Sequence, residues 1–280
     1  MNFPRTTVAG VSLPRLLIGS NWIFGWSHTG HAADVSIKEQ HSSVDPTLRL
    51  LDAFLQYGID AWVAPFSSHP DALNKIKQVE EKAGKKLILI DTPIINVDDT
   101  EAARKEANNI IKTSAQLGSK FCLIHHSSCE QLVNKNKRTI DRLGDYTDMI
   151  RQAGLIPGLS AHMPEIIQYS DLNNYDVETY IQIFNCLGFL MQVEVESVIR
   201  IIHEAKKPVM TIKPMAAGRT TPYIGLTFNW TVLRPQDMIT VGCVNEHEVH
   251  EDVEISFAAL ERRLPVLEGR SSPGKTSIIK

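Results

Sequence analysis

Hydrophobic and polar positions alternate along this chain in a regular way. Short aliphatic and β-branched runs recur roughly every 30 residues, and polar segments with helical periodicity separate most of them. This pattern is typical of a parallel α/β sheet. Eight runs predict strands, at residues 15–20, 60–64, 86–91, 120–126, 155–160, 177–184, 208–213 and 238–243. Eight βα units predict an α/β fold of the closed (β/α)8 TIM-barrel type, formed by residues 1–280 as a single domain.

Two of the connecting segments carry clear helix signals. Residues 71–82 and 100–117 place apolar side chains at helical spacing. Gly118 and Gly154 stand where helices commonly end, because glycine readily adopts the left-handed backbone of a C-terminal cap. We therefore expect helices that end at these glycines, each followed by a barrel strand.

Three segments lie outside the βα units. Residues 6–8 and 11–13 flank a two-residue turn and predict a short N-terminal hairpin that plugs the N-terminal mouth of the barrel. Residues 21–45 form the longest irregular stretch, and long loops in compact domains are commonly functional, so we expect an active-site lid. The alternative is a loop that only packs its aromatic side chains on the barrel rim. Residues 269–280, rich in Ser, Gly and Lys, predict a loosely ordered tail.

Composition narrows the range of partners. The chain has 29 Lys and Arg against 32 Asp and Glu, a formal charge of −3 without a basic run, so we expect no nucleic-acid partner. No stretch approaches the roughly 20 apolar residues that span a bilayer, and the N-terminus lacks the apolar core of a secretory signal. We expect a cytoplasmic protein without a membrane partner. The four cysteines show no C-x-x-C pattern and are expected to be reduced, buried thiols.

The chemistry of such a barrel is expected at the C-terminal ends of its strands, where the βα loops converge. Six of the ten histidines fall in or just after these loops, namely His28, His31, His69, His125, His126 and His162. His125 or His126 ends the fourth strand and suits an acid/base, a hydrogen-bond donor or a metal ligand. Asp91, His125 and His162 end three successive strands and together suit a divalent metal, although no short-range ligand spacing supports it.

Two further features stand at the ends of strands seven and eight. Lys213 suits a Schiff base, a carbonyl-polarising group or an anion-binding group, with a plain ion pair as the alternative. Gly218 and Arg219 after strand seven, with Gly242 and Asn245 after strand eight, occupy the region where barrels often hold phosphate. Asn245 alone is also explained as the N-cap of the last helix.

Four segments give the chain a resemblance to the aldo/keto reductases. They are AGLIPGLSAH (153–162), IKPMAAGR (212–219), VGC (241–243) and LIH (123–125). The resemblance implies a TIM barrel, NAD(P) as a cofactor bound near Gly218, Arg219, Gly242 and Asn245, and His125 at the position of the family's catalytic histidine.

The first half of the chain departs from this family. The family's Asp, Tyr and Lys positions fall on Val63, on Ser67 to His69 and on Asp91, so His125 alone matches its tetrad and His69 is the candidate replacement proton donor. The stretch after strand eight, NEHE (245–248), lacks the basic residues that favour a 2′-phosphate.

Three functions follow as hypotheses. The first is an enzyme acting on a small oxo or hydroxy compound, sugar-like or phosphorylated, with His125 as acid/base and Lys213 as electrophile. An NAD(P)-dependent oxidoreductase ranks first within it on resemblance alone. The second is a metal-dependent lyase, isomerase or hydrolase using Asp91, His125 and His162. The third is a non-catalytic barrel that binds a metabolite. The sequence leaves the oligomeric state open.

Overall fold

Eight parallel strands form a closed barrel in the computed structural model, which describes residues 1–69 and 72–267. The last strand pairs with the first through Ile239–Leu16 and two further register pairs. In order around the barrel the strands are β3 (Leu16–Ile18), β4 (Ala61–Ala64), β5 (Ile88–Asp91), β6 (Phe121–Ile124), β9 (Ile156–Ala161), β10 (Tyr180–Ile183), β11 (Val209–Ile212) and β12 (Met238–Val241). All eight predicted strands are confirmed, and so is the TIM-barrel fold; seven strands are shorter than their hydrophobic runs, and β9 has the predicted length but lies one residue later.

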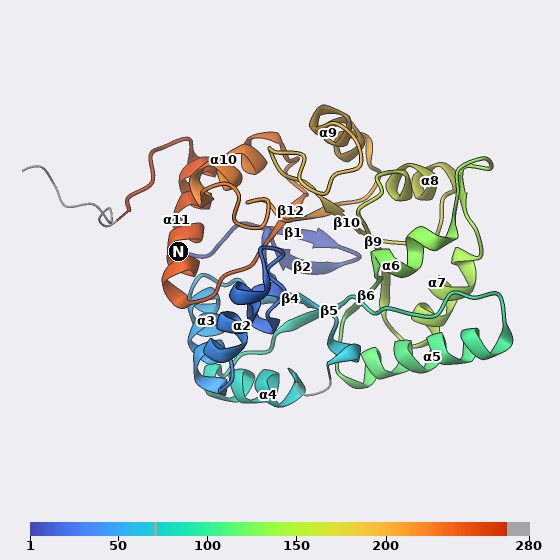
Figure 1. Ribbon diagram of the computed structural model, residues 1–280, viewed down its shortest axis with the longest axis horizontal. Coiled ribbons are helices and arrows are strands. Elements are labelled where there is room, and N and C mark those ends of the chain that lie inside the picture. The colour runs from blue at the N-terminus through green and yellow to red at the C-terminus, as the bar shows by residue number, and fades with distance from the viewer. Residues whose placement is uncertain (70–71, 268–280) are drawn as a thin grey trace, which may run out of the picture.

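Helices surround the strands on all sides (Figure 1). The outer helices are α3 (Val44–Gln56), α4 (Ala72–Ala83), α5 (Glu101–Gln116), α7 (Leu143–Gln152), α8 (Glu165–Asn173), α9 (Val195–Glu204), α10 (Pro222–Val232) and α11 (Glu246–Glu261). Thr100 caps α5 by accepting a hydrogen bond from the backbone N–H of Ala103. Gly118 and Gly154 have φ of 81° and 78° just after α5 and α7, as their positions predicted. Of the predicted 71–82 helix, Asp71 lies outside the described residues, as does the 269–280 tail.

The barrel interior is filled by side chains and is not a channel. Alternate strand residues point inward and form one buried cluster, while the others pack outward against the helices. The hairpin of β1 (Arg5–Val8) and β2 (Val11–Pro14) adds Val8 and Leu13 to the inner cluster. The predicted hairpin therefore closes the N-terminal end of the barrel. No helix in residues 1–69 or 72–267 is long and apolar enough to cross a membrane.

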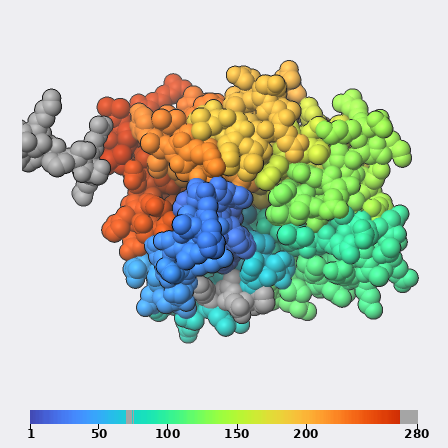
Figure 2. All heavy atoms as spheres, in the orientation of Figure 1, coloured from blue at the N-terminus to red at the C-terminus, as the bar shows by residue number. Residues whose placement is uncertain are grey.

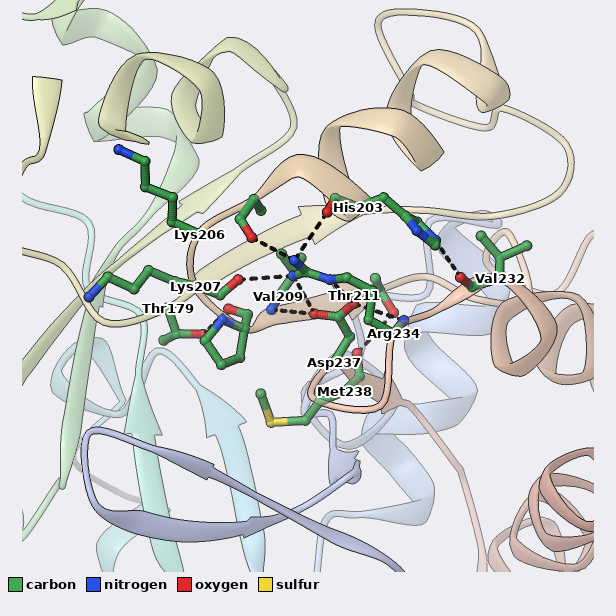
Figure 3. A network of polar contacts seen from close by, with 12 residues as sticks. Thr179, His203, Lys206, Lys207, Val209, Thr211, Val232, Arg234, Asp237 and Met238 are labelled. Atoms are coloured by element: carbon green, nitrogen blue, oxygen red, sulfur yellow. Dashed lines mark hydrogen bonds and ion pairs between the residues drawn. The ribbon is translucent and has the colours of Figure 1, made fainter. Parts of the chain in front are cut away.

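An ion pair fixes the starts of the strands that end near the cavity described below (Figure 3). Asp237, fully buried before β12, accepts hydrogen bonds from the Arg234 guanidinium at 2.8 Å and from the Val209 N–H, at the start of β11, at 2.9 Å. Arg234 also donates to the Lys207 carbonyl at 3.0 Å. The starts of β11 and β12 are therefore joined through the same buried carboxylate, which fixes the positions of the two strands relative to each other.

The structure corrects the prediction of an irregular loop over residues 21–45. This segment contains α1 (Asn21–Phe24) and α2 (His31–Gln40), and α3 begins at its end. Gly25, with φ of 76°, ends α1, and the Asp34 carboxylate accepts hydrogen bonds from the N–H and hydroxyl of Ser27. These contacts lie between residues seven apart, which a pattern of hydrophobic positions does not reveal. In Figure 2 the blue atoms of this part of the chain cover the middle of the viewed face.

The connection after β6 also contains structure that the sequence pattern did not predict. It forms α6 (His126–Cys129), a turn of 3-10 helix and a small hairpin of β7 (Val133–Asn134) and β8 (Thr139–Ile140). The hairpin strands are only two residues long, too short to show a periodic pattern. The first residue of α6 is one of the histidines of the site described next.

Candidate active site

A cavity of about 650 Å³ opens at the C-terminal ends of the barrel strands. Its floor is made of inward-pointing strand residues such as Val63 and Ile181, and its wall includes Trp22 and Trp26 of the 21–45 segment. The size suits a small organic molecule. The polar groups that line it belong to Ser20, Asn21, Ser27, His28, Thr92, His125, His126, Ser160, His162, Lys213, Thr220, Thr240, Glu248, Glu251 and Asp252.

Three histidines form a stack on one side of this cavity. The His126 ring lies 4.2 Å from the His125 ring and 4.0 Å from the His162 ring, nearly parallel to the latter. Glu130 holds the outer part of the stack, because its carboxylate accepts hydrogen bonds from the backbone N–H groups of His162 and Met163 at 2.6 and 2.8 Å. Its other oxygen lies 4.0 Å from His126 Nδ1. The sequence placed all three histidines at this mouth, and the structure shows that the His126 ring lies between the other two.

These imidazoles are neutral at pH 7. Burial, with a smaller contribution from His126, lowers the pKa of His125 to about 4 and that of His162 to about 3. Burial also lowers the pKa of His126 below its ordinary value. A neutral imidazole has a lone pair that accepts a proton, so the stack can act as a general base.

Lys213 enters the same cavity directly after β11. Burial, followed by the charge of Arg219, lowers the pKa of its ammonium to about 8. Its own charge adds to burial in lowering the pKa of His28, His126 and His162, so the three imidazoles are its near neighbours. Within residues 1–69 and 72–267 no carboxylate forms an ion pair with Lys213.

The turn that carries Lys213 has an unusual backbone. Lys213, Ala216 and Ala217 have φ of 58°, 50° and 54°, in the left-handed region that side chains with a Cβ rarely adopt. Gly218 follows with φ of 80° and lines the cavity. Such conformations cost free energy and persist where the surrounding structure enforces them, commonly at functional sites.

Two of the predicted catalytic residues lie outside the cavity. Asp91 is fully buried and accepts a hydrogen bond from the Ser67 N–H at 3.3 Å. It points outward because strand residues alternate, with Ile90 inside the barrel and Leu89 in the outer layer. Burial raises the pKa of this carboxyl group. His69 packs its ring against Phe24, with the ring centroids 5.3 Å apart, and does not line the cavity.

The predicted metal set is not brought together. Among the residues that the structure describes, no group of three His, Cys, Asp or Glu side chains could hold a metal ion, and this includes Asp91, His125 and His162. His125 Nδ1 instead lies 2.7 Å from the Ser127 hydroxyl. The outward direction of Asp91 is the physical reason that the set fails.

The two residues predicted to hold a cofactor phosphate after β12, Gly242 and Asn245, make contacts within the chain. Asn245 caps α11 by accepting from the Glu248 N–H at 3.0 Å, and the Glu248 carboxylate accepts from the Val244 N–H at 2.7 Å. A carboxylate of the chain therefore lies beside this helix N-terminus, where its charge would repel a bound anion. Trp22 also covers Gly242, since a Cβ added there would lie 2.5 Å from the indole.

The remaining predicted cofactor residue, Arg219, lies at the rim. Its guanidinium stacks over the Phe189 ring at 3.8 Å and donates to the carbonyls of Ala216 and His28 at 3.1 and 3.3 Å. Arg219 therefore ties the turn after β11 to the 21–45 segment. Gly218 beside it faces the cavity.

Sequence reasoning missed an acidic side of the cavity. Glu248, Glu251 and Asp252 of α11 all line it. Burial raises the pKa of Asp252 to about 8, and the Cys243 thiol contacts its carboxylate at 3.4 Å. The spacing of three and four residues, which places these groups on one helix face, is the signal that was available in the sequence.

Comparisons with known proteins show the fold. No family model matches the sequence, and no curated protein matches it. A Pseudomonas aeruginosa protein provisionally classed as an aldo-keto reductase shares 13% identity, with 91% of this chain and 95% of that chain covered and a TM-score of 0.65. Aldose reductase from Giardia lamblia shares 13% identity, with 94% of this chain and 89% of that chain covered and a TM-score of 0.52. A dimeric archaeal Rubisco from Hyperthermus butylicus shares 13% identity, with 94% of this chain and 65% of that chain covered and a TM-score of 0.53. The barrel is thus like that of aldo-keto reductases, as the resemblance implied.

Proposed function

We propose that this protein is an enzyme that moves a proton on a small aldehyde or ketone carrying a neighbouring hydroxyl group. Lys213 binds the carbonyl end of the substrate, and a neutral imidazole of the His126 and His162 pair is the base. The observation that carries the proposal is the position of Lys213, without an ion-pair partner among the described residues and beside three imidazoles in a cavity of about 650 Å³.

The arrangement suits enolisation. A cation at the carbonyl oxygen stabilises the negative charge that develops there when a proton leaves the adjacent carbon. The imidazole that takes this proton becomes cationic, and the Glu130 carboxylate, 4.0 Å from His126 Nδ1, stabilises it. Return of the proton to the other carbon, or to the other face of the same carbon, gives an isomer or an epimer. His126 is the stronger base of the pair, because the Glu130 charge counters the effect of burial on its pKa, whereas burial brings the pKa of His162 to about 3.

Proton transfer is measured directly by hydrogen exchange at the α-carbon. Dihydroxyacetone, glyceraldehyde and glycolaldehyde are incubated with the protein in D2O, and deuterium incorporation is followed by NMR. We expect saturable exchange that falls at least about 100-fold in Lys213→Met and in His126→Gln, since general base catalysis alone contributes about this much. His247→Gln, at an exposed position outside the cavity, is the matched control and should exchange as the wild type.

Exchange at the buffer rate with every probe would refute the proposal. If a probe then still changed the tryptophan fluorescence, through Trp22 and Trp26 in the cavity wall, the protein would be a metabolite-binding barrel without turnover.

Nicotinamide-dependent oxidation or reduction is the second candidate. The similarity to aldo-keto reductase structures over 91% of the chain favours it, and Gly218 lines the cavity. We rank this candidate second because the Glu248 carboxylate, beside the N-terminus of α11, would repel a cofactor phosphate there. Titration with NADH, NADPH, NAD and NADP, followed by tryptophan fluorescence, decides which of the two candidate functions ranks first. Micromolar binding of any of them would put hydride transfer first.

A further inference from the structure

We infer that Lys213 forms a covalent imine with the carbonyl carbon of its substrate. This inference rests on the proposed function, because it concerns the same cavity, and it adds that the carbonyl end is held by a bond and not only by charge. Within the described part of the chain, Lys213 is the one lysine that lines the cavity.

The surroundings of the amine favour a nucleophile. Two exposed lysines, Lys86 and Lys135, form ion pairs with the carboxylates of Glu80 and Glu165 at 2.6 and 2.7 Å, and Glu165 raises the pKa of Lys135. The groups that face Lys213 are different. They are the imidazoles of His28, His126 and His162, which carry no negative charge, and the guanidinium of Arg219, which repels an ammonium.

This environment increases the amount of free amine. Burial and the nearby Arg219 charge bring the pKa of Lys213 to about 8 from the ordinary 10.5. At pH 7 about one lysine side chain in ten then carries a free lone pair, roughly 300 times the fraction for an ordinary lysine. Desolvation and a neighbouring cation are the established physical means of making a lysine amine reactive toward carbonyls.

The neighbouring imidazoles supply the proton transfers that the reaction needs. The amine lone pair attacks the carbonyl carbon, and the C=O π electrons move to oxygen. The His126 and His162 pair takes a proton from nitrogen and delivers one to that oxygen, giving a carbinolamine. The proton that the Lys213 ammonium gave up to His126 on becoming a free amine is then delivered to the hydroxyl, which leaves as water, and the nitrogen lone pair forms the C=N bond of a protonated imine. Hydrolysis reverses each step, so no oxidant, reductant or other reactant is consumed.

The imine also connects to the proposed proton transfer. A protonated imine accepts electrons from a departing α-hydrogen better than a carbonyl group does, so the same imidazole base acts on a more acidic carbon. The rigid left-handed turn at Lys213, Ala216 and Ala217 fixes the point from which the amine reaches into the cavity.

Reductive trapping tests the inference. The full-length protein is incubated at pH 7 with glycolaldehyde or dihydroxyacetone and sodium cyanoborohydride, and the adducts are located by intact mass and peptide mapping. We expect the peptide that contains Lys213 to be labelled at least about 30-fold faster than peptides with exposed lysines. Lys213→Arg, which keeps the charge but lacks a nucleophilic amine, should lose this adduct and keep the slow labelling elsewhere.

The pH dependence gives a readout on the wild-type protein itself. Trapping at Lys213 should reach half its maximal rate near pH 8, and Arg219→Met should move this midpoint to higher pH. Equal labelling of Lys213 and the exposed lysines, or an unchanged adduct in Lys213→Arg, would overturn the inference. Deuterium exchange without trapping would overturn the imine and leave the proposed function standing. Trapping at Lys213 without exchange would support the imine and refute the proton transfer.

Discussion

Replacement of Lys213 by methionine is expected to stabilise the folded protein at pH 7, although it removes the residue on which the proposed chemistry depends. The folded state holds the Lys213 proton less tightly than the unfolded chain, with a pKa of about 8 against the ordinary 10.5. A tenfold change in an equilibrium constant corresponds to about 1.4 kcal/mol, so the ammonium costs about 2–3 kcal/mol after allowance for solvent screening. Methionine has a similar length and no charge, and this cost disappears.

The pH dependence of the difference in unfolding free energy between Lys213→Met and the wild type identifies the Lys213 charge as its cause. Below pH 8 both states carry the proton and the full cost is present. Between pH 8 and 10.5 the unfolded chain binds more protons than the folded one, so the stability of the wild type rises with pH and approaches that of the variant. Groups that titrate in the same range are shared by both proteins, and their effects cancel in the comparison.

Urea denaturation followed by tryptophan fluorescence, at pH 7 and pH 10, measures the difference. We expect Lys213→Met to be about 2–3 kcal/mol more stable at pH 7, or roughly 3–5 °C higher in Tm, with a much smaller difference at pH 10. Lys112→Met, at an exposed position on α5, is the control and should change stability by less than about 0.5 kcal/mol at both pH values. A variant that is no more stable at pH 7, or equally stabilised at pH 10, would refute the reasoning.

Two further predictions concern the scaffold that positions the site. Asp237→Ala is expected to lose about 3–5 kcal/mol of unfolding free energy, because the largely buried Arg234 guanidinium loses its counter-charge and the N–H at the start of β11 loses its acceptor. Asp176→Ala, at an exposed ion pair, should lose less than about 1 kcal/mol, and equal losses of the two variants in urea denaturation would contradict this reasoning. Gly242→Ala places a Cβ 2.5 Å from Trp22 and should cost about 1–3 kcal/mol and shift the tryptophan emission maximum, so an unchanged spectrum would argue against that contact.

The strand pattern was readable from the sequence because it is local. A run such as 60–64 is buried on both faces in a barrel, and its continuous hydrophobicity predicts β4 without knowledge of its neighbours. The 6–13 hairpin needs only a short turn between two extended segments. The ends of the strands then place Lys213, His125 and His162 at one mouth, since all eight strands are parallel.

The direction of each side chain at a strand end depends on register. His125 follows Leu123, which points inward, by two positions and lines the cavity. Asp91 follows Leu89, which points outward, and is buried behind the wall. Because strand side chains alternate between the two faces, assigning the inward positions from the sequence would have predicted that His125 faces the cavity and that Asp91 does not.

Other features of the site depend on segments far apart in the chain. Trp22 covers Gly242, and Arg219 joins the carbonyl of His28, contacts between residues about 200 positions apart. The Glu248 carboxylate accepts a hydrogen bond from the Val244 N–H just before α11, where the sequence showed only an acidic stretch. The sequence by itself thus determined the barrel and which residues stand at its mouth, because hydrophobic periodicity and strand direction are local properties. Only the tertiary structure decided which of these groups face the cavity and in what charge state, because burial and neighbouring charge are properties of the folded chain.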